Sequence, residues 1–187
     1  MKRPCSTLNH ATERIGRTFP QHQEMSRGYD YDAPESVHRL SSQNFPDCEP
    51  NFNTVILAGS AKATDLISTA PIPRCGFLVS GRFRSLLKSF SLPPHRFFAV
   101  PMLHRNKPVA DYSWLHLPQP NLQIPDEATA SEVEALVEAD PGLKDVDLLC
   151  IYQPQRFNYS FISDALRKAI EQEKISGVRF GTAKLFR

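Results

Sequence analysis

The stretch NYSFISDALRKAIEQEKISGVRF, residues 158–180, decides the fold, because it holds a strand end, a whole helix and a closing strand. Ser163 is a favoured N-cap, and Asp164 stands in the first turn, where the helix dipole favours a carboxylate. Gly177 lies just beyond the last periodic residues, where a left-handed backbone often ends a helix. One apolar face of the helix runs through Leu166, Ala169 and Ile170. The stretch predicts a unit of helix and strand.

Two more helices are predicted upstream. Ser80 can cap a helix whose apolar positions fall at i, i+3, i+4 and i+7, namely Phe83, Leu86, Leu87 and Phe90. Pro93 and Pro94 prevent this helix from continuing. The other helix spans about 130–139, with Val133, Leu136 and Val137 on one face, and it ends at Pro141-Gly142.

Apolar runs between these helices predict strands. TVILA at 54–58 and VDLLCIY at 146–152 suit buried strands. Residues 96–103 and 112–117 are rich in aromatic and β-branched side chains, and we expect them to pair as an antiparallel hairpin around the loop 104–111. Pro101, inside the first of these strands, indicates an edge position or a bulge.

Length and composition indicate one domain. The chain has 187 residues, and its hydrophobic share of 41% is enough for a core. We expect an α+β domain over 51–187, with a mixed or mainly antiparallel sheet of about five or six strands and two or three packing helices. Residues 1–50 are polar, lack periodicity and are interrupted by five prolines, so we expect a mobile amino-terminal arm. Tyr29 and Tyr31 could begin an edge strand there.

The chain has features of a cytoplasmic protein. Its four cysteines are widely scattered, which favours free thiols over a disulfide framework: Cys5, Cys48, Cys75 and Cys150. Basic residues near the amino terminus are not followed by the apolar stretch of a secretory signal. No window approaches the 18 apolar residues of a membrane span.

The sequence shows no recognised catalytic, phosphate-binding or metal-binding motif, so we expect neither cofactor nor metal. None of the six histidines is spaced at i, i+3 or i+4 from another. If the protein is an enzyme, the best candidate site is His104 with His116, near Asp111 and Tyr112. These two histidines flank the predicted hairpin and could meet only if its register allows.

Charge is strongly segregated although the formal net charge is only +2. The segment 74–107 has seven Lys and Arg and no acid, whereas 126–147 has eight acidic residues and one lysine. The basic block, with its interleaved phenylalanines, permits a nucleic-acid-binding module. The acidic block permits either a docking face for a basic partner or a solvated helix face. The predicted contact residues in the acidic block are Glu132, Glu134, Glu138 and Asp140.

Three segments carry a family resemblance. LVSGRFRSLL at 78–87, YSWLHL at 112–117 and FISDALRKAI…ISGVRF at 161–180 occur in an order and spacing that resemble bacterial immunity proteins of the Imm-MXAN type, found beside polymorphic toxins. The resemblance covers roughly residues 52–180. The motif positions suit core and cap roles, so they mark the fold and not the binding surface: Ser80, Phe83, Trp114, Ile162, Ser163, Leu166, Ile170, Gly177 and Phe180.

The resemblance implies a non-enzymatic role. Proteins of this family bind a cognate toxin and block it in the producing cell or its kin. We therefore expect a cognate toxin, encoded next to this chain, as the partner. The missing signal peptide favours a toxin that acts in the cytosol, and the acidic block 126–147 favours a basic toxin such as a nuclease.

Overall fold

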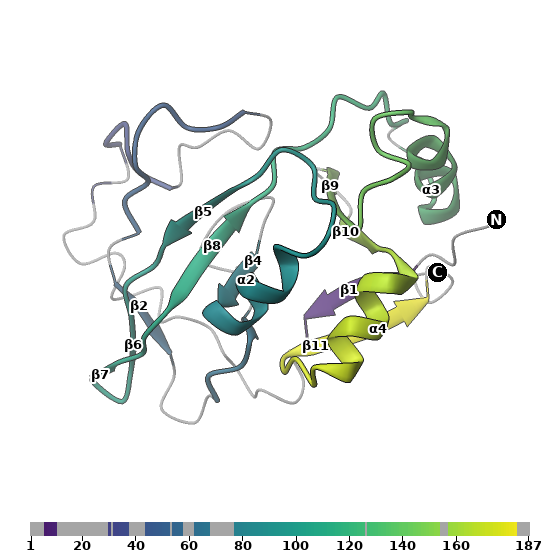
Figure 1. Cartoon of the computed structure of the whole chain (residues 1–187). Helices are drawn as coiled ribbons and strands as arrows, with labels where there is room; N and C mark the ends of the chain where they lie inside the picture. Colours follow the sequence, from purple (N-terminus) through teal and green to yellow (C-terminus); the bar gives the residue numbers. More distant parts are fainter. Residues whose placement is uncertain are drawn as a thin grey trace.

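The computed structural model describes residues 6–10, 30, 32–37, 44–52, 54–57, 62–67, 77–125, 127–153 and 157–182. Within them the chain forms three helices and three sheets, which confirms the α+β class and the mainly antiparallel pairing. The strands are shared among sheets of four, three and four strands instead of one sheet of five or six. Figure 1 shows α2 and α4 in front of the sheets and α3 beside β9 and β10.

The first four-stranded sheet joins the two ends of the described chain. Its order is β11-β1-β10-β9 and every neighbouring pair is antiparallel. The strands are β1 (Ser6–His10), β9 (Leu148–Gln153), β10 (Phe157–Ile162) and β11 (Val178–Thr182). Because β1 lies between β10 and β11, β11 is held in the sheet through β1.

The second four-stranded sheet has the order β3-β4-β8-β5, and a smaller sheet has the order β2-β6-β7. The strands are β2 (Val55–Leu57), β3 (Leu66–Ile67), β4 (Phe77–Ser80), β5 (Arg96–Ala99), β6 (Met102–His104), β7 (Lys107–Pro108) and β8 (Tyr112–His116). The predicted hairpin is confirmed, and its tip is a turn at Arg105 and Asn106, which both have positive φ.

A bulge is present in the hairpin, but on the side opposite Pro101, which itself lies between β5 and β6. The pairing shifts by one residue between Ala99, which faces Ser113, and Leu103, which faces Pro108. Four residue steps separate Ala99 from Leu103 and five separate Pro108 from Ser113, so the extra residue lies in the segment 109–112. Pro101 has no N–H to give to the ladder, but its carbonyl accepts a hydrogen bond from the Val55 N–H at 2.9 Å. This contact ties the hairpin to the parallel strand β2.

Alternating side chains of the two larger sheets enter different cores. In β9, Leu148 and Cys150 join a central core, whereas Leu149 and Ile151 face α3. Successive side chains of a strand point to opposite faces, so both faces of this sheet are covered. The central core lies between the two larger sheets and receives α2 and α4 through Phe83, Leu87, Leu166 and Ile170.

A third core covers the outer face of the β3-β4-β8-β5 sheet. Trp114, which is 2% exposed, forms an edge-to-face contact with Phe52 at 5.5 Å between ring centroids. Val37 also belongs to this core and is 1% exposed. All five residues of β8 are buried because cores lie on both of its faces.

Part of the predicted amino-terminal arm contacts the rest of the chain. Besides β1, Val37 lies in the outer core, and the carbonyl of Asn44 lies 3.0 Å from His116 Nε2. The mobility expected for residues 1–50 stays a prediction. The edge strand at Tyr29 and Tyr31 lies outside the described residues.

The three helices begin at side-chain caps. The helices are α2 (Gly81–Leu87), α3 (Ala130–Ala139) and α4 (Asp164–Gln172). Ser80 accepts a hydrogen bond from the Phe83 N–H at 3.2 Å, and Ser163 accepts one from the Leu166 N–H at 3.1 Å. Both N-caps are therefore as predicted.

The end of α4 differs from the prediction. Lys174, with φ of 52°, takes the left-handed position, and the Ile175 N–H donates to the Ile170 carbonyl at 3.0 Å. This is the Schellman pattern with lysine in the place usually held by glycine. Gly177 also has positive φ, 85°, but it lies in the turn before β11, where a Cβ would come within 2.2 Å of the Leu66 carbonyl. Close approach to β3, and not helix termination, explains this glycine.

Asp65 joins the second larger sheet to the segment between α4 and β11. Its carboxylate accepts hydrogen bonds from the Ser80 hydroxyl and from the N–H and hydroxyl of Ser176, with distances of 2.7 to 2.9 Å. Burial alone would raise the pKa of Asp65, but these hydrogen bonds and nearby Arg82 hold it below its usual value. Burial, and next the charge of Asp65, raise the pKa of Tyr112 to about 12. Asp65 is therefore charged and has a structural role, because it connects these two parts of the chain.

Candidate protein-binding groove

Helix α3 begins with a capping box that uses one of the predicted contact residues. The Thr129 hydroxyl accepts a hydrogen bond from the Glu132 N–H at 3.3 Å, and the Glu132 carboxylate accepts one from the Thr129 N–H at 2.7 Å. Hydrogen bonds from the backbone and then the side chain of Thr129 lower the pKa of Glu132. Glu132 is exposed, but its carboxylate is already engaged in starting the helix.

Asp140, at the end of α3, is engaged in a similar way. Its side chain accepts a hydrogen bond from the Gly142 N–H at 2.8 Å, a local turn that carries the chain away from the helix. Two of the four predicted contact residues, Glu132 and Asp140, thus shape the ends of α3. The structure places the other two, Glu134 and Glu138, in the wall of a groove.

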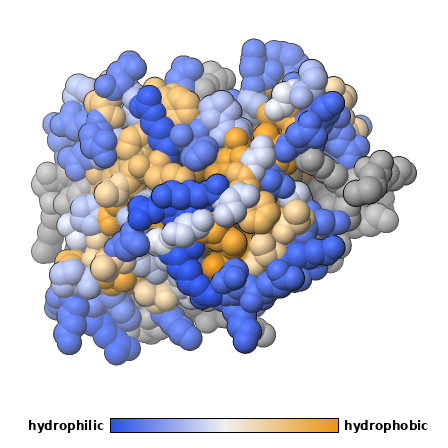
Figure 2. All heavy atoms as spheres, viewed as in Figure 1, coloured by the Kyte–Doolittle hydropathy of each residue, from blue (hydrophilic) through white to orange (hydrophobic). Residues whose placement is uncertain are grey.

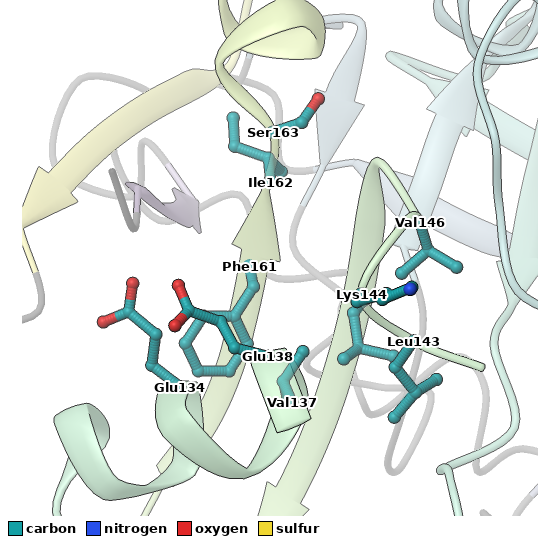
Figure 3. A pocket seen from close by; sticks show the side chains of 10 residues that line it. Glu134, Val137, Glu138, Leu143, Lys144, Val146, Phe161, Ile162 and Ser163 are labelled. Atoms are coloured by element: carbon teal, nitrogen blue, oxygen red, sulfur yellow. The ribbon is translucent and has the colours of Figure 1, made fainter. Parts of the chain in front are cut away.

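The groove lies between α3 and the sheet. Six of its ten lining residues are apolar, and they come from the helix, from the segment that follows it and from two strands: Val137, Leu143, Val146, Leu149, Phe161 and Ile162. Figure 3 shows Glu134 and Glu138 projecting side by side from α3, near Phe161. In the same view the Lys144 side chain lies on the other side of the groove.

Packing explains why the groove stays partly open. Val133 is fully buried and anchors α3 against Leu149, Ile151 and Phe161. One turn further along, Val137 is only partly buried, as are Leu143 and Val146. The end of α3 therefore leaves apolar side chains in contact with solvent. On the face drawn in Figure 2, apolar surface also gathers around the middle of the molecule and hydrophilic surface surrounds it.

Asp147 fixes the end of the groove where β9 begins. Its side chain accepts hydrogen bonds from the Ser91 N–H at 2.8 Å and from the Ser163 hydroxyl. Its backbone N–H donates to the Ser91 carbonyl at 2.6 Å, and its carbonyl accepts from the Ser163 N–H at 3.0 Å. Asp147 belongs to the acidic block, yet it is structural, and it holds Ser163 in the groove wall.

Much of the basic block is paired within the molecule. Arg84 forms an ion pair of 2.6 Å with Asp111 and donates to Ser113 at 2.8 Å. Arg82 lies 3.9 Å from Asp65 and 3.8 Å from Glu173. Arg96 donates to the Pro46 carbonyl at 3.2 Å and stacks over Phe45.

The phenylalanines of the basic block belong to the fold. Phe83 and Phe98 are buried, and Phe97 packs against the central core. They are therefore not presented as stacking platforms for bases.

The hairpin register separates the two histidines of the candidate enzyme site. His116 in β8 pairs with Arg96 in β5, at the open end of the hairpin. His104 lies eight residues after Arg96, at the tip of the hairpin. Eight extended residues span at most roughly 26 Å, and the register places His104 and His116 at opposite ends of the hairpin, so they do not share a site. His116 is 1% exposed and lies beside Trp114, with ring centroids 4.5 Å apart.

Two of the four cysteines lie in the described part of the chain. Cys48 and Cys150 are free thiols, whereas Cys5 and Cys75 lie outside the described residues. Within the described ranges, three or more His, Cys, Asp and Glu side chains nowhere gather as a metal site would require. None of the helices in the described part of the chain has the length and apolarity needed to cross a membrane.

Comparison of the sequence with known protein families and with curated proteins gives no match. The residues that resemble the immunity-protein motifs lie in the core, at helix caps, at the sheet edge or, for Gly177, in the turn before β11. Trp114, Phe83 and Leu166 are at most 2% exposed, and Phe180 is half-buried under the Arg167 guanidinium. The groove uses two of them, Ile162 and Ser163, only as parts of its wall.

Sequence reasoning missed most of the groove. It identified Glu134 and Glu138 from charge, but Leu143, Val146 and Phe161 carry no local sign that they face a common space. The one overlooked signal is Thr129-x-x-Glu132, which has the form of a capping box and assigns Glu132 to the helix start.

Proposed function

We propose that the protein is an immunity protein that binds and neutralises a cognate bacterial toxin in the cytoplasm through a stoichiometric, non-catalytic complex. The observation that carries this proposal is the apolar groove beside α3, with Glu134 and Glu138 in its wall. An apolar centre with charged residues around it is the usual composition of a protein-binding site. The resemblance of residues 52–180 to immunity proteins points in the same direction.

The use of the other polar groups supports a binding role over the rival functions. The best candidate catalytic pair, His104 and His116, is separated by the hairpin register. The arginines that suggested nucleic-acid binding, Arg82, Arg84 and Arg96, contact groups of the same chain. Charge that is paired within the molecule contributes little to binding phosphates.

Co-expression tests the proposal directly. The chain would be expressed with the product of the adjacent open reading frame, and the mixture analysed by size-exclusion chromatography. We expect one complex of fixed stoichiometry, and we expect the neighbour alone to stop growth that this chain restores. Separate elution together with a harmless neighbour would contradict the proposal.

A second assay tests the alternative that the protein binds nucleic acid. Binding of labelled DNA and RNA would be measured at low salt and again with added salt. A module that uses the block 74–107 would bind at low salt and lose affinity steeply as salt increases. We expect no such binding, because three of its arginines, Arg82, Arg84 and Arg96, contact groups of the same chain.

A further inference from the structure

We infer that the groove binds a protein segment in which one apolar side chain lies between lysine or arginine side chains. This inference rests on the proposed function, because it describes the part of the partner that the groove accepts. Its basis is the combination of a partly open apolar floor with two carboxylates on one helix face.

The geometry of α3 sets the spacing of the site. Glu134, Val137 and Glu138 stand at i, i+3 and i+4, so all three lie on one face of the helix and within one turn. Figure 3 shows the two carboxylates next to each other and Val137 further into the groove. A partner that places an apolar side chain against Val137 therefore brings its neighbouring side chains toward the carboxylates.

The sign of the local charge selects the partner. Residues 126–147 contain eight acidic residues and one lysine. The side chains of Asp140 and Asp147 accept hydrogen bonds from backbone N–H groups, and these two carboxylates belong to the acidic segment around the groove. Within the described ion pairs, Glu138 has no partner. A basic segment is attracted to this region and an acidic one is repelled.

The apolar floor adds a separate requirement. Val137, Leu143 and Val146 are partly buried hydrophobic residues, and Leu149 and Phe161 lie beneath them in the sheet. A lysine-rich segment without an apolar side chain would leave this surface in water. We therefore expect charge to set the association rate and the apolar side chain to set the lifetime of the complex.

Peptide titration of the isotope-labelled full-length protein, followed by two-dimensional NMR, tests the inference. The probe is a synthetic peptide with one leucine between two pairs of lysines. We expect saturable shifts of amide signals in α3 and in residues 143–149. Two matched peptides, one with serine in place of leucine and one with glutamates in place of lysines, should each bind at least about tenfold more weakly.

Protein variants provide the second half of the test. Glu138→Gln alone and combined with Glu134→Gln should weaken the leucine–lysine peptide progressively, by about tenfold for the pair. Glu127→Gln is the matched control, because Glu127 is exposed in the same acidic block but does not line the groove. Thermal unfolding of each variant establishes that it is folded, and Glu138 is exposed enough for its replacement to leave the fold intact.

The outcomes distinguish this inference from the proposed function. Equal binding of the serine or glutamate peptide, shifts far from α3, or no binding at all would overturn the inference. A toxin complex that forms equally well with the Glu134→Gln/Glu138→Gln protein would also overturn it while supporting the immunity role. Selective binding of the leucine–lysine peptide without any neighbour-encoded partner would support the groove chemistry and contradict the immunity role.

Discussion

At the scale of single residues, the side chain of Asp65 joins segments that are far apart in the chain. Its carboxylate holds the N-cap Ser80 and the turn residue Ser176, and its side chain is only 13% exposed. Hydrogen bonds to a charged group that is mostly shielded from water are worth more than those at the surface. We therefore expect replacement of Asp65 to disturb the fold.

Replacement of Asp65 by asparagine should lower the free energy of unfolding by about 2 kcal/mol at pH 7. The amide nitrogen would face groups that themselves donate hydrogen bonds. Urea denaturation followed by circular dichroism measures the change. Asp47→Asn, which replaces an exposed acid of the same type, is the control and should alter stability much less.

The same pair of proteins should show a defined pH dependence. The pKa of Asp65 in the folded state lies below its ordinary value. Its contribution is therefore fully present above about pH 4, the unfolded-state pKa, and is lost as the pH falls through the folded-state pKa. The stability difference between wild type and Asp65→Asn should shrink below pH 4. An equal difference at pH 3 and pH 7 would contradict the assigned role.

Replacement of Lys174 by glycine should increase the stability of the protein. A lysine in the left-handed region is strained, and glycine relieves that strain at the cost of a more flexible unfolded chain. We expect Lys174→Gly to stabilise the protein by about 0.5 kcal/mol, a rise in Tm of roughly 1–2 °C. Lys168→Gly, inside α4, is the matched control and should destabilise by about 1 kcal/mol. Scanning calorimetry would measure both, and a fall in Tm for Lys174→Gly would refute the strain.

At the scale of elements, α3 depends on its cap because its packing is light. Among residues 131–139 of α3 only Val133 is buried, whereas α2 and α4 each bury two large apolar residues, Phe83 and Leu87 in one and Leu166 and Ile170 in the other. A short helix with little tertiary support gains much of its stability from its ends. The groove wall is therefore tied to the capping box.

Thr129→Ala should lower the Tm by about 2–4 °C, because it removes the acceptor for the Glu132 N–H. In the Thr129→Ala protein, the backbone amide hydrogens of α3 should exchange with solvent faster than those of α4. Ser131→Ala is the control, since Ser131 is exposed and takes no part in the capping box. Equal exchange of α3 in the two variants would mean that the cap does not stabilise the helix.

Elements whose signals are local could be predicted from sequence, and those that depend on distant pairing could not. The helices after Ser80 and Ser163 were identified by cap and periodicity, and the hairpin by its aromatic and β-branched composition. β1 pairs only with strands near the other end of the described chain, and β3 is only two residues long, so nothing within STLNH or LI indicates a strand. The groove could not be predicted from sequence either, because its walls come from separate segments of the chain.

At the scale of the whole molecule, β1 is the element on which the first sheet depends. It is the neighbour of both β10 and β11, which do not pair with each other. Removal of residues 1–10 would leave β11 without its partner. We expect a loss of more than about 4 kcal/mol in stability, beyond the effect of an ordinary point mutation.

The truncated chain would be compared with one that lacks only residues 1–5, which precede β1. Urea denaturation, or the soluble yield if the longer truncation does not fold, provides the measurement. We expect the shorter truncation to retain most of the stability. If both chains were as stable as the full one, the central place of β1 would be refuted.

The position of β1 also determines when the molecule can be completed during synthesis. Polypeptides generally fold from the amino terminus as they leave the ribosome. Here β1 is synthesised long before its two neighbours, β10 and β11. It can pair with both of them only after nearly all of the described chain has emerged. A nascent chain that stalls before residue 178 carries an open strand edge, which is a site for pairing with other chains. The β11-β1-β10-β9 sheet is therefore completed late and in one step. We expect cellular chaperones to bind the stalled chain.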